Sequence, residues 1–484
     1  MLFLNGEWRP GGGPNFESIN PATGESLWSG HAATPDDVSA VVQSARKAFP
    51  GWCRLPFERR AELLRAFGDQ LHQHESRLAG LISAEVGKPL WDAASEVKSM
   101  IGKIDLTLEA FKSRRSDMDL SLPDGSAGVR FRPLGVVGVF GPFNFPGHIA
   151  NGQIVPALAA GNTVVFKPSE LTPLVAEETV RLWEAAGLPP GVLNLIQGGG
   201  ETGQALTENR DLNALLFTGS LRTGIALQQA LVGRPEVLLA LELGGNNPLV
   251  VHRVQNIEAA VYATLQSAYL TSGQRCTCAR RLIVTDGNEG FLKQLEAEVR
   301  RLRIGRPDSD PQPFLGPLIQ PAAVDKVLQE QEHLIDAGAV AIVPSARSPL
   351  GPSYVTPGLI DVTNCTETRD EEVFGPFLQV VRVRTLSEAI DHANRTRYGL
   401  VAGILTDNRE DYLLFSDQVR AGLINWNRPT TGASGKLPFG GRGLSGNHRP
   451  AGYWMVDSCN EPVAVLESPA LKLPETLTPG ILQS

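Results

Sequence analysis

A cysteine on a turn of small residues and a glutamate in a separate glycine-rich loop are the residues best suited to chemistry. Cys276 lies in the segment Gly273–Cys278, and Glu242 opens the segment Glu242–Pro248. A thiolate is a strong nucleophile, and a glutamate carboxylate can serve as a general base. A single cysteine is also often only a small buried apolar residue. The two segments therefore suggest the hypothesis that Cys276 is a nucleophile and Glu242 is its general base.

Four further segments accompany this pair, in a fixed order along the chain. They are Gly141–Pro146, Phe166–Glu170, Phe217–Ser220 and Glu372–Pro376. In this order the set resembles the NAD(P)-dependent aldehyde dehydrogenase superfamily, and the resemblance covers nearly the whole chain. It implies an α/β fold with a Rossmann-like cofactor domain, an α/β catalytic domain and a small β arm for oligomerisation.

The resemblance assigns catalytic roles to three residues. Cys276 would attack the aldehyde carbon, and the side-chain amide of Asn144 with the Cys276 backbone N–H would stabilise the tetrahedral oxygen. Expulsion of hydride to the nicotinamide would leave a thioester. Glu242 would then activate the water that hydrolyses it. This chemistry calls for a lowered pKa at the thiol, and partial burial of Glu242 would raise its pKa toward neutrality.

Two glycine-rich segments follow predicted strands and are candidates for phosphate binding. Gly198–Gly203 matches the G-x-G-x-x-G pattern, but the corresponding glycines of this superfamily do not cradle the pyrophosphate. Gly219–Gly224 is the better candidate, because a helix that starts there would present free N–H groups. A plain strand-to-helix turn is the alternative.

The resemblance also implies that NAD is the cofactor. Lys167 and Glu170 would hold the adenosine ribose, and the Glu170 carboxylate would repel the 2′-phosphate of NADP. The predicted cofactor-binding residues are Phe143, Lys167, Pro168, Ser169, Glu170, Gly203, Phe217, Gly219, Ser220, Leu221, Arg222, Thr223, Gly224, Leu243, Glu372 and Phe374.

Three departures from the general family pattern bear on the substrate. Phe143 stands where the family usually has Trp, and the segments Asn425–Ser434 and Ser445–Pro450 are also distinctive. Together they resemble the N-succinylglutamate 5-semialdehyde dehydrogenases of arginine catabolism. That substrate carries carboxylates remote from its aldehyde, and a cation is the natural partner. The predicted substrate-binding residues are Arg428, His448 and Arg449, for which loop shaping or a subunit interface is the alternative.

Other functions remain open at this point. A dehydrogenase that acylates coenzyme A would share the fold and the cysteine but would typically lack a base such as Glu242. Glutamate or succinate semialdehyde is the nearest rival substrate. A cysteine hydrolase lacks support from a Cys/His pair. A non-catalytic scaffold would be suggested by loss of Cys276, Asn144 or Glu242, and none of the three is lost. Cys278 forms a C-x-C pair with Cys276, but no further ligand cluster indicates a metal.

The elements that position these residues follow from periodicity. Thr34–Pro35 predicts a helix start, with Thr as N-cap, and apolar residues recur at helical spacing up to Ser113. Alternation on both sides of Pro123–Gly125 predicts a β-hairpin, and Pro462–Leu466 is a candidate partner strand. From Gly135, apolar strands alternate with helices as in parallel βαβ units. The predicted strands are Val136–Phe140, Thr163–Phe166, Val192–Ile196, Ala214–Phe217, Val237–Leu241, Leu249–Val251, Leu282–Thr285 and Ala421–Trp426.

These patterns and the family resemblance together predict a division of the chain into three parts. Residues 1–116 and 134–242 form the NAD-binding domain, and 243–454 form the catalytic domain. Residues 117–133 and 455–484 form the oligomerisation arm and the C-terminal tail. The predicted catalytic pair therefore spans the change of domain.

Composition narrows the class of protein. A chain of 484 residues exceeds one comfortable core, and its net charge of −8 speaks against nucleic acid as a partner. Five cysteines cannot form a disulfide framework, which fits a reducing compartment. No signal peptide or membrane-spanning run is visible. We therefore expect a cytoplasmic protein with no metal, nucleic-acid or membrane partner. The resemblance implies a homo-oligomer, a dimer or tetramer, with a carboxylate-bearing aldehyde as substrate.

Overall fold

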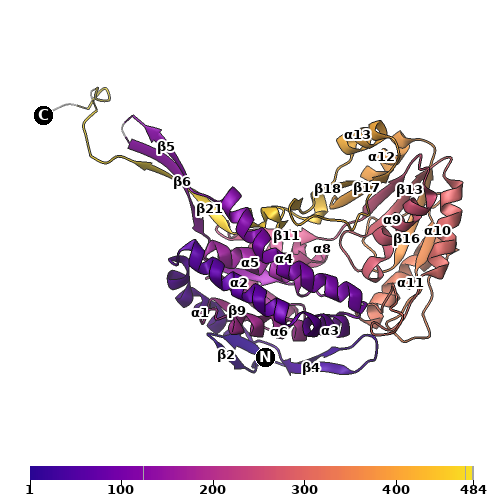
Figure 1. Cartoon of the computed structure of the whole chain (residues 1–484), viewed down its shortest axis with the longest axis horizontal. Coiled ribbons are helices and arrows are strands. Elements are labelled where there is room, and N and C mark those ends of the chain that lie inside the picture. Colours follow the sequence, from indigo (N-terminus) through magenta and orange to yellow (C-terminus); the bar gives the residue numbers. More distant parts are fainter. Residues whose placement is uncertain (124, 475, 482–484) are drawn as a thin grey trace.

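Two seven-stranded sheets, each covered by helices, make up most of the chain in the computed structural model (Figure 1). The structure describes residues 1–123, 125–474 and 476–481. The predicted α/β fold is confirmed, and both sheets are mainly parallel. None of the described helices is long and apolar enough to cross a membrane.

The first sheet has five parallel strands and an antiparallel edge formed by the N-terminus. In spatial order its strands are β11 (Leu238–Leu243), β10 (Ala214–Gly219), β7 (Val136–Phe140), β8 (Thr163–Lys167), β9 (Leu193–Leu195), β1 (Leu2–Leu4) and β2 (Glu7–Arg9). β7, β8 and β10 lie in the middle and are almost wholly buried. The five parallel strands coincide with the predicted ones to within two residues at most ends.

Helices cover both faces of this sheet because alternate strand residues point to opposite sides. Val137 and Val139 pack on one face with α2 (Phe57–Gln73), α3 (Glu75–Val86), α4 (Leu90–Arg114), α5 (His148–Ala160) and α6 (Pro173–Ala185). Val136 and Phe140 pack on the other with α1 (Pro35–Cys53), α7 (Gly200–Glu208) and α8 (Leu221–Leu231). α1 begins as predicted, because the Thr34 side chain accepts the Asp37 N–H and Asp37 reciprocates.

The second sheet begins after a short connection from β11. Its strands, in spatial order, are β14 (Val340–Val343), β15 (Gly358–Asp361), β16 (Phe377–Val383), β13 (Ala279–Thr285), β12 (Asn247–Val251), β17 (Val401–Leu405) and β18 (Leu423–Trp426). Only the β14–β15 pair is antiparallel. The covering helices are α9 (Ile257–Tyr269), α10 (Glu289–Arg301), α11 (Pro321–Asp336), α12 (Leu386–Asn394) and α13 (Arg409–Gln418).

A three-stranded ribbon projects away from both sheets (Figure 1). It consists of β5 (Met118–Leu122), β6 (Gly125–Pro133) and β21 (Asn460–Glu467), with β6 in the middle. The predicted hairpin and its predicted partner strand are therefore confirmed, although Asp124 of the hairpin turn lies outside the described residues. Two small antiparallel pairs complete the structure: β3 (Asn15–Ile19) with β4 (Ser26–His31), and β19 (Pro438–Phe439) with β20 (Ala451–Gly452).

The segment that precedes β21 returns to the first sheet. Asn447 donates its backbone N–H to Leu241 and accepts the Leu241 N–H through its side chain, so it extends the edge of β11. The 3₁₀ helix η3 (Tyr453–Ser458) then places Met455 and Val456 in the core beneath α4 and α5. The chain thus crosses between the two sheets at residues 243–247 and again near residue 446.

Candidate active site

A strained turn holds the predicted nucleophile. The 3₁₀ turn η1 (Leu270–Gly273) follows α9, and Thr271, Ser272 and Gly273 have φ values of 55°, 53° and 72°. A Cβ on Gly273 would lie 1.9 Å from the Gly375 carbonyl oxygen, so only glycine fits there. Two consecutive non-glycine residues in the left-handed region are uncommon, and such strain is found at functional sites. The turn delivers Cys276 to the junction of the two sheets.

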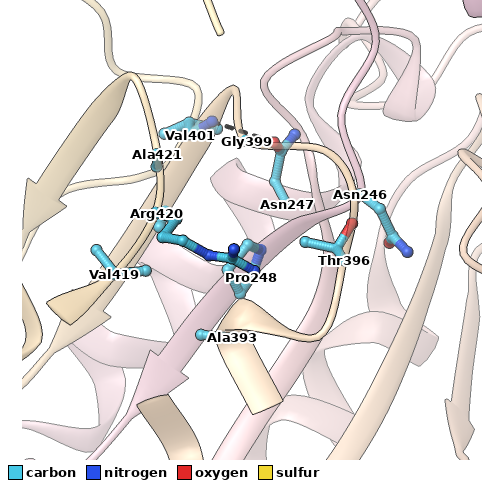
Figure 2. A pocket seen from close by; sticks show the side chains of 11 residues that line it. Asn246, Asn247, Pro248, Ala393, Thr396, Gly399, Val401, Val419, Arg420 and Ala421 are labelled. Atoms are coloured by element: carbon cyan, nitrogen blue, oxygen red, sulfur yellow. Dashed lines mark hydrogen bonds between the residues drawn. The ribbon is translucent and has the colours of Figure 1, made fainter. Parts of the chain in front are cut away.

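Contacts from both sheets fix this turn. Asp92 of α4 accepts hydrogen bonds from Thr271 Oγ1 and, at 2.8 Å, from the Arg275 guanidinium. The Asn247 side chain donates to the carbonyl oxygens of Cys276 and Cys278 at 2.7 and 2.9 Å. Its own oxygen accepts the Val401 N–H at 3.2 Å, a contact visible in Figure 2. Both sides of the nucleophile are therefore tied to buried elements.

The residues around Asn247 in Figure 2 also surround a small cavity of about 10 Å³. That volume is about enough for one water molecule. This cavity is therefore too small for a substrate or a cofactor.

Asn144 lies in the loop between β7 and α5 and reaches the turn of the nucleophile. Its side-chain nitrogen donates to the Gln274 carbonyl oxygen at 2.8 Å. Glu96 fixes the same loop from below, because one carboxylate oxygen accepts the N–H groups of Gly147 and His148, each at 2.9 Å. An amide carries two N–H groups. Asn144 therefore retains one donor for a reacting oxygen beside Cys276.

Glu242 lies near the end of β11, 2% exposed, with its carboxyl against the Cys276 thiol. Burial raises the pKa of Glu242, the adjacent Cys276 thiol lowers it and the nearby Glu372 raises it, and the resulting pKa is about 8. The β11 edge is held from outside by Asn447, and Ser445 donates to the Gly244 carbonyl oxygen at 2.7 Å. The carboxyl thus has the raised pKa that the sequence led us to expect.

The pKa of the Cys276 thiol differs from the lowered value that the sequence led us to expect. Burial raises the pKa of Cys276 well above its usual value, and the carboxyl groups of Glu242 and Glu372 raise it further. Two neighbouring acids oppose a negative charge on sulfur, and the nearest cation on the same loop, Arg275, is paired with Asp92. In this structure Cys276 is therefore held as a neutral thiol. Cys278 is buried, and its sulfur donates to the Leu270 carbonyl oxygen.

One large cavity, about 1200 Å³ in volume, joins the three predicted catalytic residues to most of the predicted cofactor residues. Cys276, Glu242 and Asn144 lie on its wall. The predicted cofactor residues that also line it are Phe143, Lys167, Ser169, Glu170, Gly203, Phe217, Gly219, Ser220, Arg222, Thr223, Leu243, Glu372 and Phe374. Pro168, Leu221 and Gly224 belong to the same turns but do not line the cavity.

Two features of the cavity suit a dinucleotide. The N-terminus of α8 opens into it, and the Ser220 side chain caps that helix by accepting the Thr223 N–H. Lys167, at the end of β8, is buried, which lowers its pKa to about 8, and its ammonium donates to the Pro168 carbonyl oxygen at 3.0 Å. A buried cation beside an open cavity is well placed to meet hydroxyl groups or phosphate.

The predicted substrate residues lie elsewhere. Arg428 and His448 are exposed, and neither they nor Arg449 line the cavity that contains Cys276. Arg449 donates to the Gly441 carbonyl oxygen, and both His448 and Arg449 have φ near 54°. In this structure the distinctive segment around residue 448 shapes a loop that supports β11.

Sequence reasoning missed the residues that hold the site together. Asn247 and Asp92 hold the turn of Cys276, and Glu96 holds the loop of Asn144. Lys326 of α11 is an additional cation on the cavity wall. Asn247 lies two residues after Gly245 in the segment Glu242–Pro248, so the local sequence carried a signal for it. The helical spacing of Asp92 and Glu96 looks like that of any partly polar helix.

The sequence profile of the aldehyde dehydrogenase family matches residues 8–465, and the chain therefore belongs to this family. It is 49% identical, over 99% of its length and 98% of the relative's, to the N-succinylglutamate 5-semialdehyde dehydrogenase of Serratia proteamaculans strain 568. The enzyme of the same name from Pseudomonas fluorescens strain Pf0-1 is 50% identical, over 99% of both chains. The crystal structure of Staphylococcus aureus betaine aldehyde dehydrogenase in complex with NAD⁺ superposes with a TM-score of 0.91, at 26% identity, covering 99% of this chain and 96% of that one.

Proposed function

We propose that this enzyme oxidises N-succinylglutamate 5-semialdehyde to N-succinylglutamate with NAD as hydride acceptor. The observation that carries the proposal is the convergence of Cys276, Glu242 and Asn144 on one large cavity. The substrate is supported by relatives of that name at 49–50% identity over almost the full chain. The distinctive segments Asn425–Ser434 and Ser445–Pro450 support the same substrate, because they too resemble those enzymes.

The chain's own residues perform the chemistry in two stages. The Cys276 sulfur bonds to the aldehyde carbon and its thiol proton passes to Glu242 or to water, while Asn144 and the Cys276 N–H stabilise the oxygen. NAD held in the cavity would supply the acceptor for the hydride that leaves this carbon. A thioester on Cys276 remains. Glu242 then takes a proton from water, hydroxide adds to the thioester carbon, and the acid leaves as the thiol is restored.

The residues of the cavity fit the cofactor. The buried Lys167, the Glu170 carboxylate near it and the capped N-terminus of α8 all line the cavity, and the Glu372 carboxyl is close enough to Cys276 to raise the pKa of its thiol. Phe374 meets the Phe143 ring edge to face, with centroids 5.9 Å apart. We assign the adenosine end of NAD to Lys167 and Glu170 and its nicotinamide end to Glu372 and Phe374. With the domains divided at residues 242–243, the first pair belongs to the NAD-binding domain and the second to the catalytic domain.

Assembly is a further part of the proposal. The ribbon of β5, β6 and β21 projects from the body and exposes large apolar side chains, among them Leu120 (66% exposed) and Leu466 (80% exposed). Exposed strand edges and apolar side chains are surfaces that proteins normally cover. We propose that this ribbon joins copies of the chain into a homo-oligomer. The cytoplasmic location stays a prediction.

A panel of aldehydes with NADH absorbance as readout tests the proposed activity. N-succinylglutamate 5-semialdehyde should give the highest kcat/KM, ahead of glutamate semialdehyde, succinate semialdehyde and propanal. Coenzyme A should not be required, because Glu242 is present to activate water. Preference for another carboxylate-bearing aldehyde would keep the family mechanism and overturn the substrate, whereas dependence on coenzyme A would overturn hydrolysis.

A further inference from the structure

The buried face of α4 carries three charged residues, and one of them lacks a partner. Asp92, Glu96 and Lys103 are only 1%, 2% and 6% exposed, and their spacing of four and seven residues puts them on one side of the helix. Asp92 pairs with Arg275 at 2.8 Å, and Glu96 pairs with Lys88 at 2.5 Å. Lys103 has neither an ion-pair partner nor a hydrogen-bond acceptor within the described part of the chain.

An unpaired buried lysine is unfavourable. Burial lowers the pKa of Lys103 to about 8, with no carboxylate that raises it. Lysine is almost never fully buried without a partner, because desolvation of the ammonium is costly. An apolar residue of similar length would pack at this position without that cost. The position therefore calls for an anion that the chain itself does not supply.

Lys103 packs against α5 close to a second side chain that lacks a partner. Gly152 of α5 faces it, and a Cβ on Gly152 would lie 3.6 Å from Lys103 Cε and 3.8 Å from Nζ. One turn earlier on α5, His148 has a buried Nδ1 without a hydrogen-bond partner. Two polar side chains on neighbouring helices thus both lack partners.

His148 is a neutral donor at this site. Burial lowers its pKa to about 3, and the positive charges of Lys103, Lys88 and Arg275 lower it further. An uncharged imidazole still carries one N–H group that can donate to an anion. Lys103 supplies the charge and His148 can supply a hydrogen bond.

This pair lies next to the site of the reaction. His148 follows Asn144 by four residues, and Ile149 lines the same cavity as Cys276. On the other side, the loop that contains Arg428 crosses α4 beyond Lys103, where a Cβ on Gly435 would lie 2.9 Å from Leu106. Lys103 therefore lies one turn of α4 from the contact with this loop, and it packs against α5, whose first turn lines the cavity of Cys276.

We propose that the Lys103 ammonium binds a carboxylate of the aldehyde substrate, with His148 as a second donor to it. This inference rests on the proposed function and names a specificity-determining residue for it. The carboxylates of N-succinylglutamate 5-semialdehyde are separated from the aldehyde carbon by a carbon chain. An anion site on α4 and α5, away from Cys276, meets that requirement.

Lys103→Met tests the proposal, because methionine keeps much of the length and removes the charge. Lys98→Met on the exposed side of the same helix is the matched control. Loss of the charged contact should raise KM for N-succinylglutamate 5-semialdehyde about ten- to a hundredfold. The kcat/KM for butanal should stay unchanged, since butanal has no carboxylate. Lys103→Arg should retain part of the affinity, and Lys98→Met should leave both aldehydes unaffected.

Binding of the product N-succinylglutamate, measured by calorimetry, provides a readout independent of turnover. Lys103→Met should weaken that binding by a similar factor without lowering Tm, because it removes an unpaired buried charge. Equal losses with both aldehydes, or a large fall in Tm with unchanged product binding, would show that Lys103 is structural.

The outcome for the wild-type enzyme separates this inference from the proposed function. If the wild type oxidises the succinylated aldehyde and Lys103→Met keeps its KM, only the inference on Lys103 fails. If the wild type prefers succinate semialdehyde, the proposed substrate fails. The Lys103 variants measured with succinate semialdehyde then decide the anion site: a selective rise in KM supports it, and an unchanged KM overturns it.

Discussion

The Glu242 carboxyl lies beside the Cys276 thiol at the junction of the two sheets, close enough for each group to shift the pKa of the other. Glu242 is the last residue but one of β11 in the first sheet, whereas Cys276 follows a turn that leads into the second. An ionised Glu242 raises the pKa of the thiol, so the two groups do not both ionise readily. One carboxyl is thus placed to receive a proton from the thiol first and, after that proton is released to solvent, to receive another from water.

Replacement of the nucleophile should stop the reaction at its first step. Cys276→Ala should lower kcat by about a thousandfold or more, because no other group bonds to the aldehyde carbon. NAD binding, followed by quenching of protein fluorescence, should change little. Cys278→Ala is the control, and it should keep substantial activity because Cys278 is buried. Near-normal turnover of the Cys276 variant would rule out the covalent mechanism.

Glu242→Gln should separate the two half-reactions. The thioester should still form but hydrolyse about a hundred- to ten-thousandfold more slowly, the usual contribution of a general base. Rapid mixing should then show a burst of NADH equal to the active sites, followed by a very slow steady state. Normal steady-state turnover would remove Glu242 from the mechanism.

The pH dependence of hydrolysis should follow the raised pKa of Glu242. A base acts only when ionised, and burial raises the pKa of this carboxyl to about 8. The rate of the steady-state phase after the burst should therefore rise with pH from 6, reach half its maximum near pH 8 and level off above about pH 9. Glu242→Gln should lose this rise, because it has no ionisable group at that position. A wild-type rate that is flat from pH 6 to 9 would contradict the assignment.

The choice between NAD and NADP should depend on Glu170, whose carboxylate follows β8. Glu170 lines the cavity beside Lys167 and should oppose a 2′-phosphate, so NAD should be preferred over NADP in kcat/KM. Glu170→Ser should narrow that preference by about tenfold or more, mainly by improving NADP, because like charges placed together cost several kcal/mol. A wild-type preference for NADP would show that another contact overrides the carboxylate.

The sequence by itself determined the elements and the family of this protein. The apolar runs at Val136–Phe140 and Thr163–Phe166 predicted buried parallel strands, and the hairpin near residue 124 was recognised from its alternation. These features depend on neighbours within a few residues, so local sequence contains them. Cys276, Glu242 and Asn144 were identified because each stands in a recognisable segment.

Tertiary structure decided the electrostatics and the supports of the site. The thiol of Cys276 was expected to have a lowered pKa, but folding surrounds it with carboxyl groups and apolar contacts that raise it. Asn447 was part of a segment predicted to meet substrate, yet it pairs with Leu241, some 200 residues earlier in the chain. A pKa depends on every charge and on the solvent around a group, and those are set by residues distant in sequence.

The burial of Lys103 is the clearest feature that the sequence alone did not predict. In the sequence it is one lysine in a long helix that also contains Lys98, and no motif distinguishes the two. Only the packing of α4 against α5 buries Lys103 and exposes Lys98. Helical periodicity gives the face on which a side chain lies, but the partner that each charge finds is decided by which elements meet in space.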